Sequence, residues 1–262
     1  MDLGLKGRRA LVMGASKGLG RAVADALAAE GVHIVISGRD QATLDKAAAE
    51  LRGLGASSAI GVQADVAEAA DMDRLVEAAQ AAMGGVDILV LNHGGPPPGS
   101  AQDLTEAALT TWFRRIVLSP IQVANKVLPG MKAQKWGRIL TVGSSGMQQP
   151  IAGLALSNVL RAGIVGWNKT LSAEVIKDGI TCNIIAPGTI STDRIQELNG
   201  ARAAKEGRSL EEISAERAAE IPAGRFGRPD EFGPMGAFLA SEKASYITGM
   251  IIRADGGIVR HV

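Results

Sequence analysis

The apolar residues of this chain fall into short runs that are separated by amphipathic stretches. Runs rich in β-branched and other apolar residues predict strands at residues 10–13, 32–36, 59–62, 86–91, 138–142, 181–186 and 250–253. Apolar residues at helical spacing predict helices after the first run, over 40–54 and 72–83, before Lys132, and from Leu160 to Val175. Strand and helix therefore alternate along most of the chain.

This alternation predicts the fold class. Strands that are apolar on both faces are typical of parallel sheets with helices on both sides. We therefore expect one α/β domain over residues 1–262, with a Rossmann fold built on a doubly wound parallel sheet of about seven strands.

Two segments interrupt the alternation. Residues 94–99, Gly-Gly-Pro-Pro-Pro-Gly, form a rigid loop after a strand, and this loop is either ligand-facing or a simple connector. The segment Asp193–Glu220 is long, charged and helical in propensity, and it is either a substrate lid or a solvated excursion. We favour a lid over 193–220, because the segment follows a strand end that faces the ligand in folds of this class.

Composition and charge narrow the classes of function. The chain is 46% hydrophobic and 21% charged, which provides enough apolar surface for a large core. Its 28 basic and 27 acidic residues give a net charge of +1, so no field attracts nucleic acid or a membrane surface, and a small-molecule ligand is expected. With one cysteine and no run of about 18 apolar residues, the chain is expected to be a soluble cytoplasmic protein without internal disulfides.

A glycine-rich turn follows the first predicted strand and opens the first predicted helix. In that setting glycines allow a tight turn and a close approach of the backbone to a pyrophosphate, which also meets the positive end of the helix dipole. The turn therefore predicts a dinucleotide-phosphate site formed by Gly14, Ser16, Lys17, Gly18, Leu19 and Gly20.

The residues after the second strand indicate which dinucleotide binds. Ser37-Gly38-Arg39-Asp40 has no acid at the position where one would accept from a ribose 2′-hydroxyl. Arg39 and Lys17 instead supply cations for a 2′-phosphate, to which a guanidinium donates two hydrogen bonds. We therefore predict NADP(H) as the cofactor, with NAD(H) less favoured; the alternative is that both cations are solvated surface charges.

Several motifs, in order along the chain, resemble those of the short-chain dehydrogenase/reductase family. The resemblance rests on the glycine turn, on Leu91-Asn-His-Gly94, on the Pro-Gly segment from residue 187, and on residues 245–249 with 255–257. It implies a carbonyl or alcohol substrate and a homo-oligomer, commonly a tetramer, built on helices around 103–131 and 151–175. It also implies further cofactor-binding residues, namely Asp65, Val66, Asn92, Gly94, Pro187, Gly188, Thr189, Ile190 and Thr192.

The catalytic positions are where this chain departs from the family it resembles. The family serine falls on Ser144, and the family tyrosine lies thirteen positions later, where this chain has Ser157. Four positions further on, Arg161 replaces the family lysine, and we expect it to bind the cofactor ribose. The i, i+4 spacing places Ser157 and Arg161 on one helical face. Ile116 stands where the family has its proton-relay asparagine, although Trp112 suggests another register.

The proton donor is open at this stage. A serine hydroxyl is a far weaker acid than the phenol of the family tyrosine. His93 takes the family's alanine position beside the cofactor channel, and an imidazole with an ordinary pKa of about 6.5 donates at neutral pH. His93 is therefore a candidate catalytic residue together with Ser144, Ser157 and Arg161. The alternatives are a water held by the two serines, and a packing role for His93.

Three hypotheses follow for the function. The preferred one is an NADP(H)-dependent oxidoreductase of carbonyls and alcohols, similar to 3-oxoacyl reductases, in which Ser144 polarises the carbonyl oxygen. The second is an NADP(H)-binding sensor or partner subunit without hydride-transfer activity, which the missing tyrosine favours. The third, a cofactor-independent lyase-like or dehalogenase-like relative, is disfavoured because it would not need the complete glycine turn.

Overall fold

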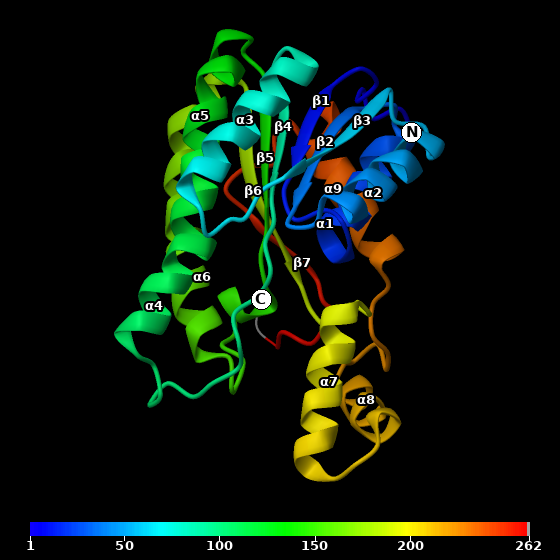
Figure 1. Cartoon of the computed structure of the whole chain (residues 1–262), viewed down its shortest axis with the longest axis vertical. Helices are drawn as coiled ribbons and strands as arrows, with labels where there is room; N and C mark the ends of the chain where they lie inside the picture. The colour runs from blue at the N-terminus through cyan, green and yellow to red at the C-terminus, as the bar shows by residue number, and fades with distance from the viewer. Residues whose placement is uncertain (261–262) are drawn as a thin grey trace.

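The computed structural model describes residues 1–260 and contains one parallel sheet of seven strands (Figure 1). The strand order is β3-β2-β1-β4-β5-β6-β7, and all neighbouring strands are parallel. The strands are β1 (Arg9–Val12), β2 (His33–Gly38), β3 (Ser58–Gln63), β4 (Ile88–Leu91), β5 (Gly137–Val142), β6 (Ile180–Pro187) and β7 (Ile251–Ala254). The predicted doubly wound Rossmann fold is confirmed.

Helices cover both faces of the sheet (Figure 1). One face carries α1 (Gly18–Ala29), α2 (Gln41–Gly53) and α9 (Pro229–Ala240). The opposite face carries α3 (Ala69–Met83), α5 (Ser119–Ala133) and α6 (Ala155–Val175). The remaining elements are α4 (Glu106–Phe113), α7 (Asp193–Glu206), α8 (Leu210–Ala219), the π-helical turn η1 (Arg114–Leu118), and the short 3-10 turns η2 (Ser145–Met147), η3 (Ile176–Asp178) and η4 (Glu242–Ala244).

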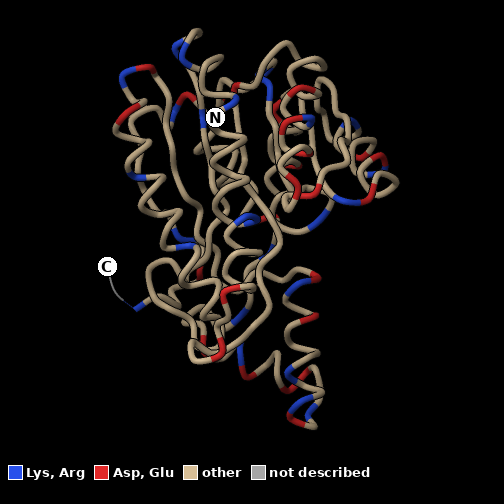
Figure 2. The backbone as a smooth tube through the Cα atoms, turned by 60° about the vertical axis from the view of Figure 1, so that its left-hand side comes forward, with Lys and Arg blue, Asp and Glu red and all other residues tan. Residues whose placement is uncertain are grey.

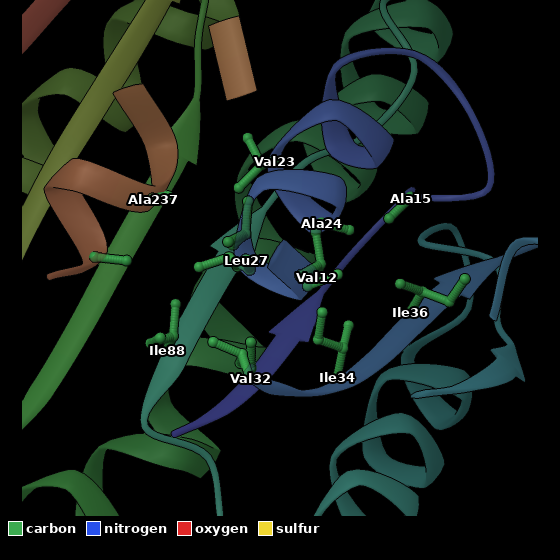
Figure 3. Packing of buried hydrophobic residues seen from close by; sticks show 14 of the residues in the cluster. Val12, Ala15, Val23, Ala24, Leu27, Val32, Ile34, Ile36, Ile88 and Ala237 are labelled. Atoms are coloured by element: carbon green, nitrogen blue, oxygen red, sulfur yellow. The ribbon is translucent and has the colours of Figure 1, made fainter. Parts of the chain in front are cut away.

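The apolar strands pack against the apolar faces of these helices. On the α1 side, Val12, Ile34 and Ile36 of β1 and β2 belong to the same cluster as Val23 and Leu27 of α1 (Figure 3). None of these five side chains is more than 1% exposed. Burying a side chain of this size contributes about 1.5–3 kcal/mol. The sheet is therefore a firmly packed platform for the loops that follow its strands.

Helix α9 lies in a segment for which the sequence analysis predicts no helix. Two prolines and two glycines, Pro229, Gly233, Pro234 and Gly236, obscure the helical pattern there. Pro229 occupies the first turn, where a missing N–H breaks no helical hydrogen bond. A Cβ on Gly233 would lie 2.2 Å from the carbonyl oxygen of Ala22, so this glycine is what allows α9 to pack closely against α1.

Helices α7 and α8 project from the body of the protein as a hairpin that spans most of the predicted 193–220 segment (Figure 1). Acidic and basic residues are interspersed along it (Figure 2). Arg202 lies 2.6 Å from both Glu206 and Glu216, and Arg208 lies 2.5 Å from Glu216. Exposed ion pairs contribute little individually, but a network of shared partners holds the two helices in one arrangement.

Within residues 1–260, none of the helices combines the length and the apolar character that crossing a membrane requires.

Candidate active site

The carboxyl ends of the parallel strands lie along one edge of the sheet. The strand order reverses between β1 and β4, so the loops after these strands leave in opposite directions, and folds of this kind bind ligands at that point. The glycine turn follows β1, Asn92 and His93 follow β4, Ser144 follows β5, and Pro187 ends β6. The structure therefore brings the predicted site residues to one edge.

The glycine turn is held by a side chain from β4. Gly14 has φ +56° and Gly18 has φ +66°, in the left-handed region that favours glycine. The Asn92 side-chain amide donates to the carbonyl oxygens of Met13 at 3.2 Å and of Gly14 at 2.9 Å. A Cβ on Gly20 would lie 2.6 Å from Asn92 Nδ2, so a side chain there would displace this clamp. Asn92 therefore acts on the turn that would hold a phosphate.

The first turn of α1 fits a phosphate group. Lys17 is the N-cap residue and makes no side-chain hydrogen bond to the helix, and the first N–H groups of a helix have no intrahelical acceptor. No atom lies within 4 Å of the position that a Cβ on Gly18 would take, so the space beside the backbone is open. Ser16 is half-buried beside Gly38 of β2, and Leu19 packs against the core. These features fit a pyrophosphate at residues 14–20.

Arg39 and Asp65 meet in a pocket of about 380 Å³ whose other lining residues are Gln63, Asp71 and Arg74. Arg39 is exposed and makes no ion pair among residues 1–260, so its guanidinium is available to a ligand. Asp65 Oδ1 accepts from the Ala67 backbone at 2.9 Å, and its own backbone N–H donates to Asp71. The carbonyl of the neighbouring Val66 accepts from Ser119 at 2.6 Å.

The cations around this pocket differ in part from those predicted. Lys17 does not line the pocket; its ammonium lies 3.1 Å from Asp193 at the start of α7. Arg74 of α3 does line it, paired with Asp71 at 2.7 Å. No sequence motif marks Arg74, because α3 reaches the pocket only through the folding of the sheet. The site therefore contains a second guanidinium that the sequence analysis missed.

The segment after β6 is fixed by backbone contacts. The Gly188 N–H donates to the Ala254 carbonyl at 3.0 Å, and a Cβ on Gly188 would lie 2.7 Å from the Cα of Asp255. Beyond it, the N–H of Gly227 donates to the Thr189 carbonyl at 3.0 Å, Ile190 forms a bridge with that glycine, and Thr192 is the N-cap of α7. The Pro187 segment thus lies between the sheet edge and the α7–α8 hairpin.

Ser157 and Arg161 meet at the carboxyl end of β5, two residues before Ser144. Ser157 and Arg161 lie on α6, as the i, i+4 spacing predicts, and Arg161 Nε donates to Ser157 Oγ at 3.2 Å. Arg161 Nη1 donates to the carbonyl of Val142, the last residue of β5, at 3.2 Å. Ser144 Oγ accepts from the Gly146 N–H at 3.1 Å. Because both serine oxygens act as acceptors in these bonds, both hydroxyl protons remain available to a ligand.

His93 lies close to this group and is neutral. Burial of the imidazole, and secondly the positive charge of Arg161, lower the pKa of His93 to about 3, although a hydrogen bond to the Gly94 carbonyl opposes the shift. His93 Nδ1 donates to that carbonyl at 2.8 Å, which places the proton on Nδ1 and leaves Nε2 as an acceptor. The expectation of an ordinary imidazole pKa is therefore wrong: at neutral pH this side chain is uncharged, and its Nε2 accepts a hydrogen bond but has no proton to give.

The π-helical turn η1 carries Ile116, an apolar residue at the position aligned with the family's proton-relay asparagine. Ile116 is fully buried in η1 and packs in one cluster with Leu156 and Leu160 of α6. A π turn accommodates one extra residue within a continuous helix. The segment that faces α6 at this level is therefore apolar, and Ile116 cannot relay a proton.

Two further features lie outside this edge. A cavity of about 560 Å³ is lined by residues near the amino ends of the strands, among them Arg9, Asp87 and Gln134. Arg9 and Asp87 form a 2.5 Å ion pair there, and Arg8 pairs with Glu242 at 3.0 Å. Within residues 1–260, no three His, Cys, Asp or Glu side chains are grouped so that they could hold a metal ion.

Comparisons with known proteins place this geometry in context. Residues 14–259 match the family model described as enoyl-(acyl carrier protein) reductase. The chain is 36% identical over 257 residues to D-beta-hydroxybutyrate dehydrogenase of Cupriavidus necator, which covers 97% of this chain and 99% of that protein. It is 32% identical over 256 residues to the 3-oxoacyl-(acyl-carrier-protein) reductase FabG of Escherichia coli, covering 98% and 99%. The crystal structure of L-sorbose reductase from Gluconobacter frateurii, complexed with NADPH and L-sorbose, superposes with a TM-score of 0.95 at 32% identity over 100% of both chains.

Proposed function

The chain belongs to the short-chain dehydrogenase/reductase family, and we propose that it is an NADP(H)-dependent oxidoreductase that interconverts a carbonyl and an alcohol. The observation that carries this proposal is the contact of Arg161 with Ser157 and with the carboxyl end of β5, two residues before Ser144, on the edge that also holds the glycine turn. NADP(H), when bound, supplies or accepts the hydride. The names of the three relatives reported above all describe oxidoreductases, which supports the same class of reaction.

The cofactor site has a donor set suited to NADP(H). The N–H groups at Gly18, Leu19 and Gly20 bind the pyrophosphate at the start of α1. Arg39, a cation without an ion pair among residues 1–260, binds the 2′-phosphate, and Asp65 with Val66 lies on the adenine side. The NADPH in the L-sorbose reductase structure supports this choice of dinucleotide.

The nicotinamide end of the cofactor lies between β4, β5 and β6 in this proposal. Pro187, Gly188, Thr189, Ile190 and Thr192 receive the carboxamide, and their backbone is already fixed against β7 and the residues after α8. Arg161 keeps the ribose-binding role of the family lysine, because free N–H groups remain on its guanidinium after its two internal hydrogen bonds. Asn92 and Gly94 complete the site from the end of β4.

The reacting oxygen of the substrate binds to Ser144. Its hydroxyl proton is free, so it polarises a carbonyl oxygen or orients an alcohol, and Ser157 supplies a second hydroxyl. The proton leaves to solvent when the alcohol is oxidised and comes from solvent when the carbonyl is reduced, because one route serves both directions. With a pKa of about 3, the neutral His93 does not take up this proton at neutral pH, and its Nε2 accepts a hydrogen bond from the alcohol or from water. His93 is therefore not the proton donor in this proposal.

The α7–α8 hairpin serves as the substrate lid in this proposal. Its first turn contacts both sides of the site: Asp193 lies 3.1 Å from Lys17 of the glycine turn, and Arg194 donates to the Pro96 carbonyl of the 94–99 loop at 3.2 Å.

We also propose that the protein is cytoplasmic and that it forms a homo-oligomer. The assembly is supported by the exposed apolar side chains of Phe113 in α4, Leu118 in η1 and Val159 in α6. Light scattering at micromolar concentration tests the assembly, and a monomer would disprove it.

The test of the proposed function is NADPH oxidation by the purified protein with ketones, diketones and β-ketoacyl thioesters. Titration of NADPH and NADH comes first, and we expect tighter binding of NADPH, with the difference reduced in Arg39→Ala. Ser144→Ala and Ser157→Tyr are then compared with the wild type. Turnover that Ser144→Ala abolishes supports the proposal. Binding of neither dinucleotide would overturn it.

A second function is favoured by one observation, the serine at position 157 in place of the family tyrosine. In that case the protein binds NADP(H) and does not transfer hydride, and it acts as a sensor or partner subunit. Tight NADPH binding, no turnover by the wild type and turnover by Ser157→Tyr would select this function over the first.

A further inference from the structure

Arg161 is a buried cation without a counter-charge. Its side chain belongs to a residue that is 8% exposed, and no carboxylate lies within ion-pair distance of it among residues 1–260. Burial lowers the pKa of Arg161 to about 10, so the guanidinium is still charged at neutral pH. Taking an ion out of water costs several kcal/mol unless an opposite charge compensates. The fold therefore holds a positive charge that its own side chains leave unbalanced.

The groups around Arg161 do not supply the missing charge. Its hydrogen-bond acceptors, the Ser157 hydroxyl and the Val142 carbonyl, are neutral. His93 is neutral as well, and its Nδ1 proton is committed to the Gly94 carbonyl. The ribose hydroxyls of the proposed cofactor are also uncharged, and its phosphates lie at the glycine turn after β1. Cofactor binding thus occupies donors of Arg161 without balancing its charge.

Several hydrogen-bond donors of Arg161 and of the two serines are available to a ligand. Both N–H groups on Arg161 Nη2 have no acceptor among residues 1–260, and the hydroxyl protons of Ser157 and Ser144 are free. A serine at 157 keeps a hydroxyl but lacks the aromatic ring of the family's tyrosine. A group of the substrate can therefore contact the guanidinium where the family has the protein's own ring.

We propose that the substrate of this enzyme carries a carboxylate, which binds to Arg161 and Ser157 while Ser144 holds the reacting oxygen. A guanidinium binds a carboxylate through two parallel hydrogen bonds, and the Ser157 hydroxyl supplies another donor. One buried cation balances a single negative charge, which fits a carboxylate better than a phosphate dianion. The inference rests on the proposed function, because it concerns the substrate of the same site.

The geometry also restricts the length of the substrate. Arg161 Nη1 is anchored on the Val142 carbonyl, only two residues before Ser144. The carboxylate and the reacting carbonyl are therefore close neighbours in the substrate, as in a 2-oxo or 3-oxo acid and the corresponding hydroxy acids. The substrate class is thus 2-oxo or 3-oxo acids and the corresponding hydroxy acids, rather than simple ketones.

The test uses two probes of the same shape, acetoacetate and its neutral analogue acetoacetamide. Both are titrated by calorimetry into the full-length protein saturated with NADP⁺, which forms no product with an oxo compound. We expect acetoacetate to bind about tenfold more tightly than acetoacetamide. The preference should disappear in Arg161→Met, persist in part in Arg161→Lys, and be unchanged in Arg225→Met, a remote exposed arginine paired with Glu231.

The outcomes separate this inference from the proposed function. Equal affinities, a preference for acetoacetamide, or no acetoacetate binding at millimolar concentration would overturn the carboxylate site. If neutral ketones are then turned over with NADPH, the proposed function still stands. If NADP⁺ and NADPH fail to bind in the preceding titration, the proposed function fails instead. Arg161→Lys retains the charge and guards against misinterpreting a folding defect of Arg161→Met.

Discussion

Two buried arginines lie near opposite ends of β5, and the protein holds them in different ways. Arg138 belongs to the amino end of the strand, and Arg161 of α6 contacts its carboxyl end. Arg138, 2% exposed, donates to the carbonyls of Ser241, Gly137 and Gly179, and its guanidinium lies 4.3 Å from the Trp136 ring centroid. Arg161, 8% exposed, donates to one carbonyl and one hydroxyl, and no aromatic ring stacks on it among residues 1–260. The same type of side chain is saturated with contacts at one end of the strand and unsaturated at the other.

This difference distinguishes a charge that holds the fold from a charge that awaits a ligand. Burial lowers the pKa of each arginine to about 10, so both remain charged at neutral pH. At Arg138, carbonyl dipoles and an aromatic face offset the loss of hydration. At Arg161 the protein makes fewer compensating contacts, and in our proposal a bound molecule supplies the rest. On this proposal, stability and function are divided between the two ends of β5.

The largest effect is expected from Arg138→Met. The substitution removes the donor from three carbonyl oxygens, two of them in buried hydrogen bonds and the third, of Gly179, in a part-buried one. At roughly 1 kcal/mol each, the free energy of unfolding should fall by about 2–3 kcal/mol. Urea unfolding measures the loss, and NADP⁺ affinity of the folded protein should not change. If Arg138→Met unfolds with the same free energy as the wild type, Arg138 does not stabilise the fold and the comparison fails.

Arg161→Met should show the opposite behaviour. We expect kcat/KM to fall about 100-fold, because a charged donor set at the substrate is lost. The free energy of unfolding should change by less than about 1 kcal/mol, or rise, because an unpaired buried charge is removed. Enzyme kinetics and urea unfolding of the same preparation measure both quantities. A destabilisation as large as that of Arg138→Met would show that Arg161 is structural.

Trp136→Leu tests the aromatic part of the comparison. Arg8 lies 3.9 Å from the Trp136 ring centroid and Arg138 lies 4.3 Å from it, so the ring contacts two cations. Loss of both contacts should lower the free energy of unfolding by about 1–2 kcal/mol and leave catalysis unchanged. If thermal and urea unfolding match the wild type, hydrogen bonds alone hold Arg138.

The last effect concerns pH and appears only below neutrality. The pKa of His93 is about 3 in the folded protein, below its ordinary value of 6.5, so the unfolded chain binds more protons between these values. The contribution to stability is complete above pH 6.5 and is lost as pH falls toward 3. His93→Gln should flatten this part of the stability profile. Arg161→Met should raise the His93 pKa in an NMR titration, whereas Arg138→Lys should not move it.

The fold could be predicted because its signals are local. The strand at 138–142, for example, is one residue shorter than the observed β5, because an apolar run between polar residues marks a buried strand directly. The helix α9 could not be predicted, since its glycines serve contact with α1 and only the packed structure shows that contact. The positions of Ser157 and Arg161 on one face followed from helical spacing.

The state of the site residues could not be predicted in the same way. The tautomer of His93 depends on the Gly94 carbonyl, and its pKa depends on burial and on Arg161, which is 68 positions away in the chain. Arg74 reaches the pocket of Arg39 from α3 without any motif. These properties arise from tertiary contacts, which spacing within one helix or one turn does not encode.

The clamp between Asn92 and the glycine turn has a consequence for synthesis of the protein. The amide of Asn92 donates to the Gly14 carbonyl across 78 positions of the chain. β1 also pairs with β4, which is made only after β2 and β3 have been completed. A nascent chain that has emerged only as far as β3 therefore carries the whole glycine motif without the residue that fixes its shape. We expect the nascent chain to acquire affinity for the dinucleotide late, once β4 and Asn92 have left the exit tunnel of the ribosome.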